Sequence, residues 1–121
     1  MSELIEYRSN IEKADLAQGL GQAACLAGLY EQAGRLFEQS LSTFQKLGFA
    51  SEEAGSWRNL GELYTAQGKV QEALESLERA AQLHEKLEDS LSLVYDRISL
   101  GQSYLVLGEA SRSLAVLVLQ P

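Results

Sequence analysis

The stretch Trp57-Arg58-Asn59-Leu60-Gly61-Glu62-Leu63-Tyr64 decides the fold of this chain, because its Leu-Gly pair recurs at a fixed spacing. One pair lies 40 residues earlier and another 40 residues later, at Leu20-Gly21 and Leu100-Gly101. A second glycine follows seven residues after the glycine of each pair, at Gly28, Gly68 and Gly108. Self-similarity at a fixed period predicts a solenoid of stacked units, and such folds expose long surfaces suited to binding other proteins.

Two further columns keep the same register. One holds small residues, Ala33, Ala73 and Ser113, and the other holds large apolar residues, Phe37, Leu77 and Leu117. A glycine inside a helix costs about 1 kcal/mol relative to alanine, so three glycines in register need a compensating gain. We expect each glycine of the Leu-Gly pairs to lie opposite the small residue of its unit, where it lets two helices pack closely.

The middle unit predicts a helical hairpin. Its apolar positions recur every three or four residues, Ser51 is placed as an N-cap, and Gly68 supplies a left-handed backbone at the helix end. Applied to all units, the pattern predicts helices at about Glu12–Ala27, Tyr30–Leu47, Glu52–Gln67, Val70–Leu87, Leu91–Leu107 and Glu109–Leu119.

The residues Trp57-x-x-Leu60-Gly61-x-x-Tyr64, followed by Gly68, Ala73, Leu77 and Ala80, resemble the tetratricopeptide repeat. The resemblance implies an all-α, right-handed α-solenoid of about three helical hairpins, a single domain over residues 1–121. The repeats are expected at about 12–50, 52–89 and 91–120, with 1–11 as an N-terminal cap or the end of a preceding helix. The period of 40 resembles a longer variety of the repeat rather than the common 34-residue form.

Composition limits the function. The formal net charge is −7, from 17 acidic and 10 basic residues, and the bases are scattered singly, which disfavours nucleic-acid binding. No long apolar run or signal peptide is found, so we expect a cytoplasmic protein that does not bind membranes.

Nothing in the sequence assembles into a catalytic or metal-binding set. Cys25 is the only cysteine and His84 the only histidine. We interpret Cys25 as a small apolar filler and His84 as a solvated side chain on a helix surface. The sequence therefore predicts a protein that is not an enzyme and has no cofactor.

The resemblance also implies a concave groove lined by the first helix of each hairpin. The polar residues expected there are Asp15, Gln18, Gln22, Arg58, Asn59, Glu62, Thr65, Tyr95, Ser99 and Gln102. Asn59 stands at a position where repeats of this family often place an asparagine that hydrogen-bonds the backbone of an extended peptide. Arg58 could add a charge-assisted bond to a carboxylate.

Two functions remain open at this level. The first is a protein-interaction scaffold that binds a peptide or helix in the groove, and the second is a structural or self-assembly segment without a peptide ligand. The second is favoured by the apolar run Leu114-Ala115-Val116-Leu117-Val118-Leu119, because a helix apolar around its circumference needs cover on more than one side. We expect this run to form an oligomer interface through Leu114, Val116, Leu117, Val118 and Leu119, in a two-fold dimer or a longer repeat array.

Overall fold

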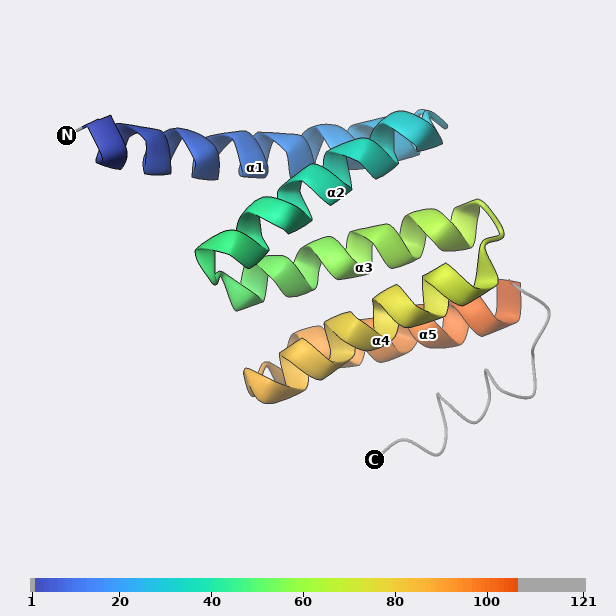
Figure 1. The fold of residues 1–121 in the computed structure, drawn as a ribbon. Helices are drawn as coiled ribbons and strands as arrows, with labels where there is room; N and C mark the ends of the chain where they lie inside the picture. Colours follow the sequence, from blue (N-terminus) through green and yellow to red (C-terminus); the bar gives the residue numbers. More distant parts are fainter. Residues whose placement is uncertain (1, 107–121) are drawn as a thin grey trace.

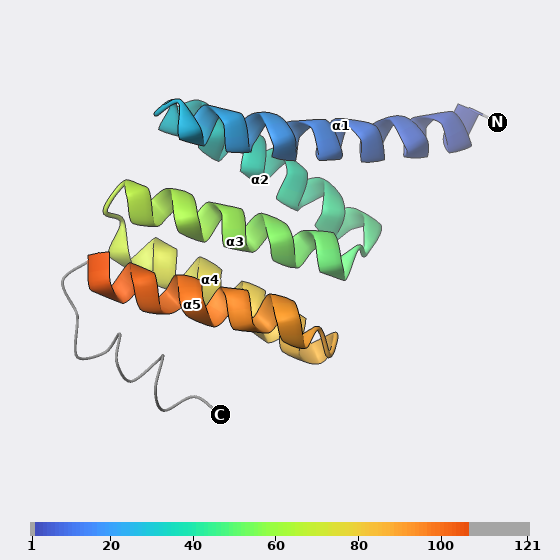
Figure 2. The same ribbon diagram turned by 180° about the vertical axis from the view of Figure 1, so that it is seen from behind.

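Five α-helices that run back and forth make up the computed structural model, which describes residues 2–106 (Figure 1). They are α1 (Ser2–Leu26), α2 (Tyr30–Leu47), α3 (Ala50–Ala66), α4 (Val70–Lys86) and α5 (Ser90–Val106). Helices α2 and α4 lie on one face of the stack, and α1, α3 and α5 lie on the other (Figure 2). The predicted all-α stack of hairpins is confirmed, while the helix predicted at Glu109–Leu119 lies outside the described residues.

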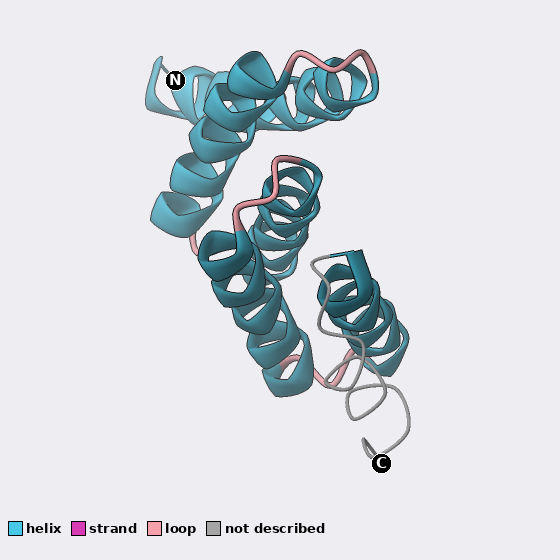
Figure 3. Cartoon of the chain, turned by 90° about the vertical axis from the view of Figure 1, so that its right-hand side faces the viewer, coloured by secondary structure: helices cyan, strands magenta, loops and turns pink. Residues whose placement is uncertain are grey.

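Short loops join the helices, and residues 2–106 contain no strand (Figure 3). Gly28, Gly48 and Gly68 each follow a helix with positive φ, between 74° and 79°. In each turn the next residue's N–H bonds a carbonyl five residues back, as Lys69 does to Tyr64 at 2.9 Å, which closes the helix end. Glu88 takes the corresponding position after α4 with a φ of 57°, so this turn forms without glycine.

Three helix starts differ from the sequence-based prediction, that of α5 by one residue and those of α1 and α3 by more. Helix α1 begins at Ser2 rather than Glu12, because residues 2–18 contain neither glycine nor proline to stop it. Its added turns reach the loop after α2, where the ring of Tyr7 packs edge-on against Phe49 at 6.5 Å between centroids.

The predicted N-cap at Ser51 was wrong. Helix α3 already begins at Ala50, the residue before it is Phe49, and no side chain caps that end. A side-chain cap does occur at α5, where the Asp89 carboxylate accepts the Ser92 N–H at 3.1 Å. Hydrogen bonding to Ser92 holds the pKa of the Asp89 carboxyl group below its usual range.

Close helix approach at the glycine column is confirmed, but the opposing residue is not the one expected. A Cβ on Gly61 would lie 2.5 Å from Leu77 Cγ, and one on Gly21 would lie 2.6 Å from Phe37 Cε1. The glycines therefore make room for the large apolar column. The small column contributes through its backbone, since Ala73 O lies 3.3 Å from the same Gly61 position.

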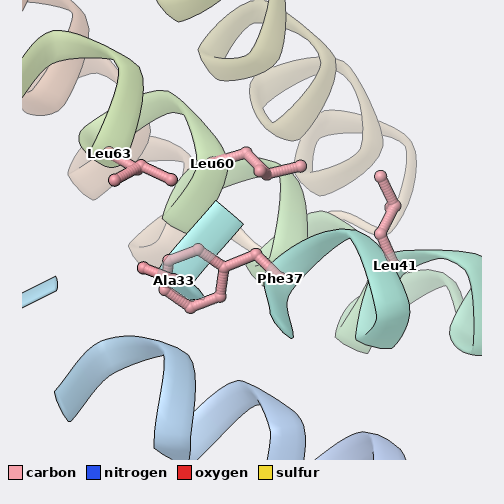
Figure 4. Packing of buried hydrophobic residues seen from close by; sticks show 5 residues of the cluster. All are labelled: Ala33, Phe37, Leu41, Leu60 and Leu63. Carbon is pink, nitrogen blue, oxygen red and sulfur yellow. The ribbon is translucent and has the colours of Figure 1, made fainter. Parts of the chain in front are cut away.

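The core between the first and second hairpins joins α2 to α3 (Figure 4). Ala33, Phe37 and Leu41 of α2 pack against Leu60 and Leu63 of α3, and each of the five is at most 8% exposed. Phe37 thus serves two contacts, one within its own hairpin at Gly21 and one with the next hairpin. The Phe37 side chain therefore helps to set both the distance between α1 and α2 and the distance between α2 and α3.

Gly61→Ala should destabilise the fold by about 1–3 kcal/mol, because its methyl group would overlap Leu77 near that side chain's branch point. The matched control is Gly19→Ala, at a helical glycine whose added Cβ meets nothing within 4 Å. The control should gain up to about 1 kcal/mol from helix propensity. Urea unfolding of both variants checks this, and equal effects would show that Gly61 is not at a tight contact.

Candidate functional site

A polar hollow of about 310 Å³ is lined by residues of α1, α3 and α5, the helices in front in Figure 2. Its lining comes from all three helices: Gln22, Arg58, Asn59, Glu62, Tyr95 and Ser99. A second hollow of about 470 Å³ adjoins it between α3 and α5 and shares Glu62, Tyr95 and Ser99. The helices repeat their spacing, so residues 40 apart in sequence line one continuous surface, which we call the groove.

Eight of the polar residues predicted from sequence line these hollows. Besides the six of the first hollow, Thr65 and Gln102 line the second. Gln18 instead faces the α1–α3 contact, where its Oε1 accepts the Ser56 hydroxyl at 3.5 Å, and Asp15 is exposed outside both hollows. The sequence prediction missed Ile98 and Ser103, which also line the second hollow.

The amide of Asn59 is the most informative group in the groove. Its Nδ2 atom is buried and has no hydrogen-bond partner within the protein. A buried N–H group left unpaired costs about 1–3 kcal/mol, so such groups are uncommon without a reason. Asn59 lines the first hollow together with its neighbour Arg58 and with Glu62.

Two hydroxyl groups in the second hollow, those of Thr65 and Ser103, are already paired, with their oxygens 2.9 Å apart. Each oxygen also lies 2.8 Å from a carbonyl of its own helix, Gly61 for Thr65 and Ser99 for Ser103. Because each hydroxyl carries one hydrogen, one of the two donates to the other, and that second hydroxyl donates to its carbonyl. These bonds tie α3 to α5 and fix the width of the groove at this end.

Arg58 has two carboxylates beside it. Its Nη1 lies 3.7 Å from Asp96 Oδ1, and its Nε lies 4.0 Å from Glu62 Oε1. Loss of water around Glu62 raises the pKa of its carboxyl, and the charge of Arg58 partly opposes that rise. The guanidinium is therefore held in place by the protein's own acids, which weakens the interpretation that it clamps a partner's carboxylate.

His84 is buried, contrary to the prediction of a solvated side chain. It is 3% exposed, and its Nδ1 contacts Asp96 Oδ2 between α4 and α5. Burial raises the pKa of the Asp96 carboxyl, while the contacts with His84 and Arg58 lower it. A chain of three groups thus runs from α4 through α5 to the groove side of α3, and it positions Arg58.

Chemistry beyond binding finds no support among the described residues. No group of three or more potential metal-binding side chains comes together between residues 2 and 106. Cys25 packs at the edge of the core between α2 and α3, in agreement with its interpretation as a small filler. In the same part of the chain, no helix has the length and apolar character needed to cross a membrane.

Comparison with known proteins agrees with this architecture. A sequence model described as tetratricopeptide repeat matches residues 10–86 and 52–117. The structure is similar to the crystal structure of BtubC (BKLC) from P. vanneervenii, with a TM-score of 0.77 and 25% sequence identity. That match covers 86% of this chain but 43% of the other, so this chain spans less than half the length of BtubC. A search of curated proteins found no match.

His84→Leu should destabilise the fold by about 3 kcal/mol at pH 7, because it leaves the buried Asp96 carboxyl group without its contact to His84 and with Arg58 as its remaining partner. The matched reference is the double variant His84→Leu with Asp96→Leu, which should be more stable than the single variant because it removes the buried charge as well.

The same pair of variants gives a pH prediction. Burial raises the folded-state pKa of Asp96 above its unfolded value, so the folded protein binds this proton more tightly. Stability linked to this group is therefore full at low pH and lost as the pH rises through the folded pKa. Urea unfolding at neutral pH and at successively lower pH should show the free energy of unfolding of His84→Leu rising relative to that of the double variant as the pH falls. A constant difference would contradict the assignment.

Proposed function

Because this chain belongs to the tetratricopeptide repeat family, we propose that it is a protein-interaction scaffold that binds an extended peptide or a helix in its groove. Members of this family generally bind other proteins and are typically non-catalytic. The partner is a segment of another protein, and the residues that contact it line the two hollows on α1, α3 and α5.

The observation that carries the proposal is the buried, unpaired Nδ2 of Asn59, a residue that lines the groove. An extended peptide carries backbone carbonyls along its length that have no partner within the peptide. If the Asn59 side chain turns its amide toward the groove, one such carbonyl would accept its N–H and remove the penalty that the free protein carries. A peptide backbone supplies this acceptor whatever its side chains, which suits a groove lined by amides and hydroxyls.

Charge indicates which peptides fit. Arg58 is balanced by Glu62 and Asp96, Asp15 is exposed nearby on α1, and the whole chain carries a net charge of −7. The surface around the groove therefore repels acidic segments and attracts basic ones over roughly a Debye length, about 8 Å at physiological salt. We propose a neutral or basic peptide as the ligand.

The exposed apolar surface of α1 favours a second function, self-assembly. Leu16 and Leu20 are 62% and 50% exposed on a face away from the groove. The two functions use different surfaces, so one does not exclude the other.

Asn59→Ala should change the affinity for a peptide without lowering the folding stability of the protein. It should weaken a groove-bound peptide about tenfold, the effect of losing roughly 1.4 kcal/mol of hydrogen bonding. It should leave the free energy of unfolding unchanged or raise it, because the buried unpaired N–H is removed. Peptides selected from a random library displayed on phage serve as probes, measured by isothermal titration calorimetry.

The control is Gln39→Ala, at an exposed residue of α2 on the opposite face, which should change neither quantity. Arg58→Ala, Glu62→Ala and Gln102→Ala extend the test along the groove. Peptides that bind all four groove variants with wild-type affinity would place the binding surface elsewhere.

A further inference from the structure

The outer face of α1 carries the same column of residues that is buried in the following repeats. Leu20 is 50% exposed, whereas Leu60 and Leu100, in the same column, are 2% and 8% exposed. Ala23 is likewise exposed, whereas Leu63 in its column is 1% exposed. Within the described part of the chain, α1 thus presents a packing face that is uncovered.

The molecule itself shows what covers such a face. Leu60 and Leu63 are buried by Ala33, Phe37 and Leu41 of α2, the second helix of the preceding hairpin (Figure 4). Helix α4 packs in the same way on α5, the next first helix. By analogy, the exposed face of α1 is suited to pack against the second helix of another hairpin of this repeat type.

We propose that the outer face of α1 binds residues 109–119 of a second copy of this chain, so that copies stack head to tail. By sequence this segment repeats the columns of α2 and α4: Ser113 corresponds to Ala33 and Ala73, and Leu117 to Phe37 and Leu77. The proposed contact continues, between two copies, the interface that α2 and α3 form within one.

Side-chain sizes across the contact support this occupant. Between the first two hairpins a small residue meets a large one: a Cβ on Gly34 would lie 3.5 Å from Leu63 Cδ2. At the junction between α4 and α5, the large residue is on the second helix and the small one on the first: Leu74 corresponds to Gly34, and Ser103 corresponds to Leu63. Across the proposed contact they hold Leu114 and Ala23, which again pairs one large with one small residue. Tight packing depends on such volume matching.

This arrangement differs in symmetry from the two-fold dimer predicted from the sequence. A head-to-tail contact joins two different surfaces, so an open assembly always has one free surface of each kind at its two ends, and it grows into chains or closes into a ring. A two-fold contact pairs one surface with itself and stops at a dimer. The two arrangements therefore respond differently to blocking one surface at a time.

The experiment blocks each surface separately. Leu16→Glu with Leu20→Glu places charges on the α1 face, and both side chains are exposed, so folding should be preserved. Leu114→Glu blocks the other surface, and circular dichroism confirms that its helix content is retained. The control is Leu26→Glu, at an α1 leucine that is 92% exposed but shares its column with the exposed Ala66.

Sedimentation velocity over a range of concentrations gives the result. Wild type and Leu26→Glu should form concentration-dependent oligomers, and each blocked variant alone should be monomeric, with association weakened at least about tenfold. An equimolar mixture of the two blocked variants should form a 1:1 dimer that does not grow, because one intact α1 face meets one intact C-terminal surface.

Three outcomes would overturn the proposal. A wild type that stays monomeric at high micromolar concentration removes the contact altogether. A Leu16→Glu/Leu20→Glu variant that still dimerises alone shows two-fold pairing through the C-terminal segment, and a Leu114→Glu variant that still dimerises alone shows pairing of α1 with itself.

Exchange of the side-chain sizes tests the pairing of Ala23 with Leu114. Ala23→Leu should weaken association about tenfold by overfilling the contact. Adding Leu114→Ala should restore most of that loss. A double variant no better than Ala23→Leu would show that these two residues do not meet.

Discussion

The fold of residues 2–106 depends on a contact, seen in both hairpins described there, between a glycine in the first helix and a large apolar side chain in the second. Leu77 fills the space that a side chain on Gly61 would occupy, and Phe37 does the same at Gly21. These contacts bring the helices of a hairpin together, and Phe37 also reaches Leu60 in the next hairpin. Each repeat is therefore placed by the one before it, and polar residues 40 apart in sequence come to line one groove.

The periodic part of the sequence predicted the periodic part of the structure. The Leu-Gly pairs, the turn glycines and the apolar columns recur in register, so the hairpins and most of the groove lining could be assigned from it. A feature that occurs in only one repeat cannot be predicted from the 40-residue periodicity. His84 and Asp96 show this: neither residue type recurs in its column, the two lie 12 residues apart, and only the packing of α4 on α5 brings them together.

Local signals were weaker guides than the register. A serine before a run of helical pattern is a good N-cap in isolation, yet α3 begins before Ser51, because the preceding turn at Gly48 already sets the chain direction. In the same way, the absence of repeat columns in residues 2–11 gave no reason to extend α1, although nothing in those residues stops a helix. Competing tertiary contacts, here Tyr7 on Phe49, decided the outcome.

The buried His84–Asp96 pair makes the two junctions between hairpins non-equivalent. In its column His84 corresponds to Phe44, and Asp96 corresponds to Ser56, which pairs with Ser40 at 3.3 Å. If the chain slipped by one repeat during folding and set α5 against α2, Asp96 would be buried beside Phe44 without its histidine. Leaving a carboxylate in that position costs several kcal/mol. The pair thus favours the native order of the repeats, in a chain whose shared glycine and apolar columns recur at each repeat.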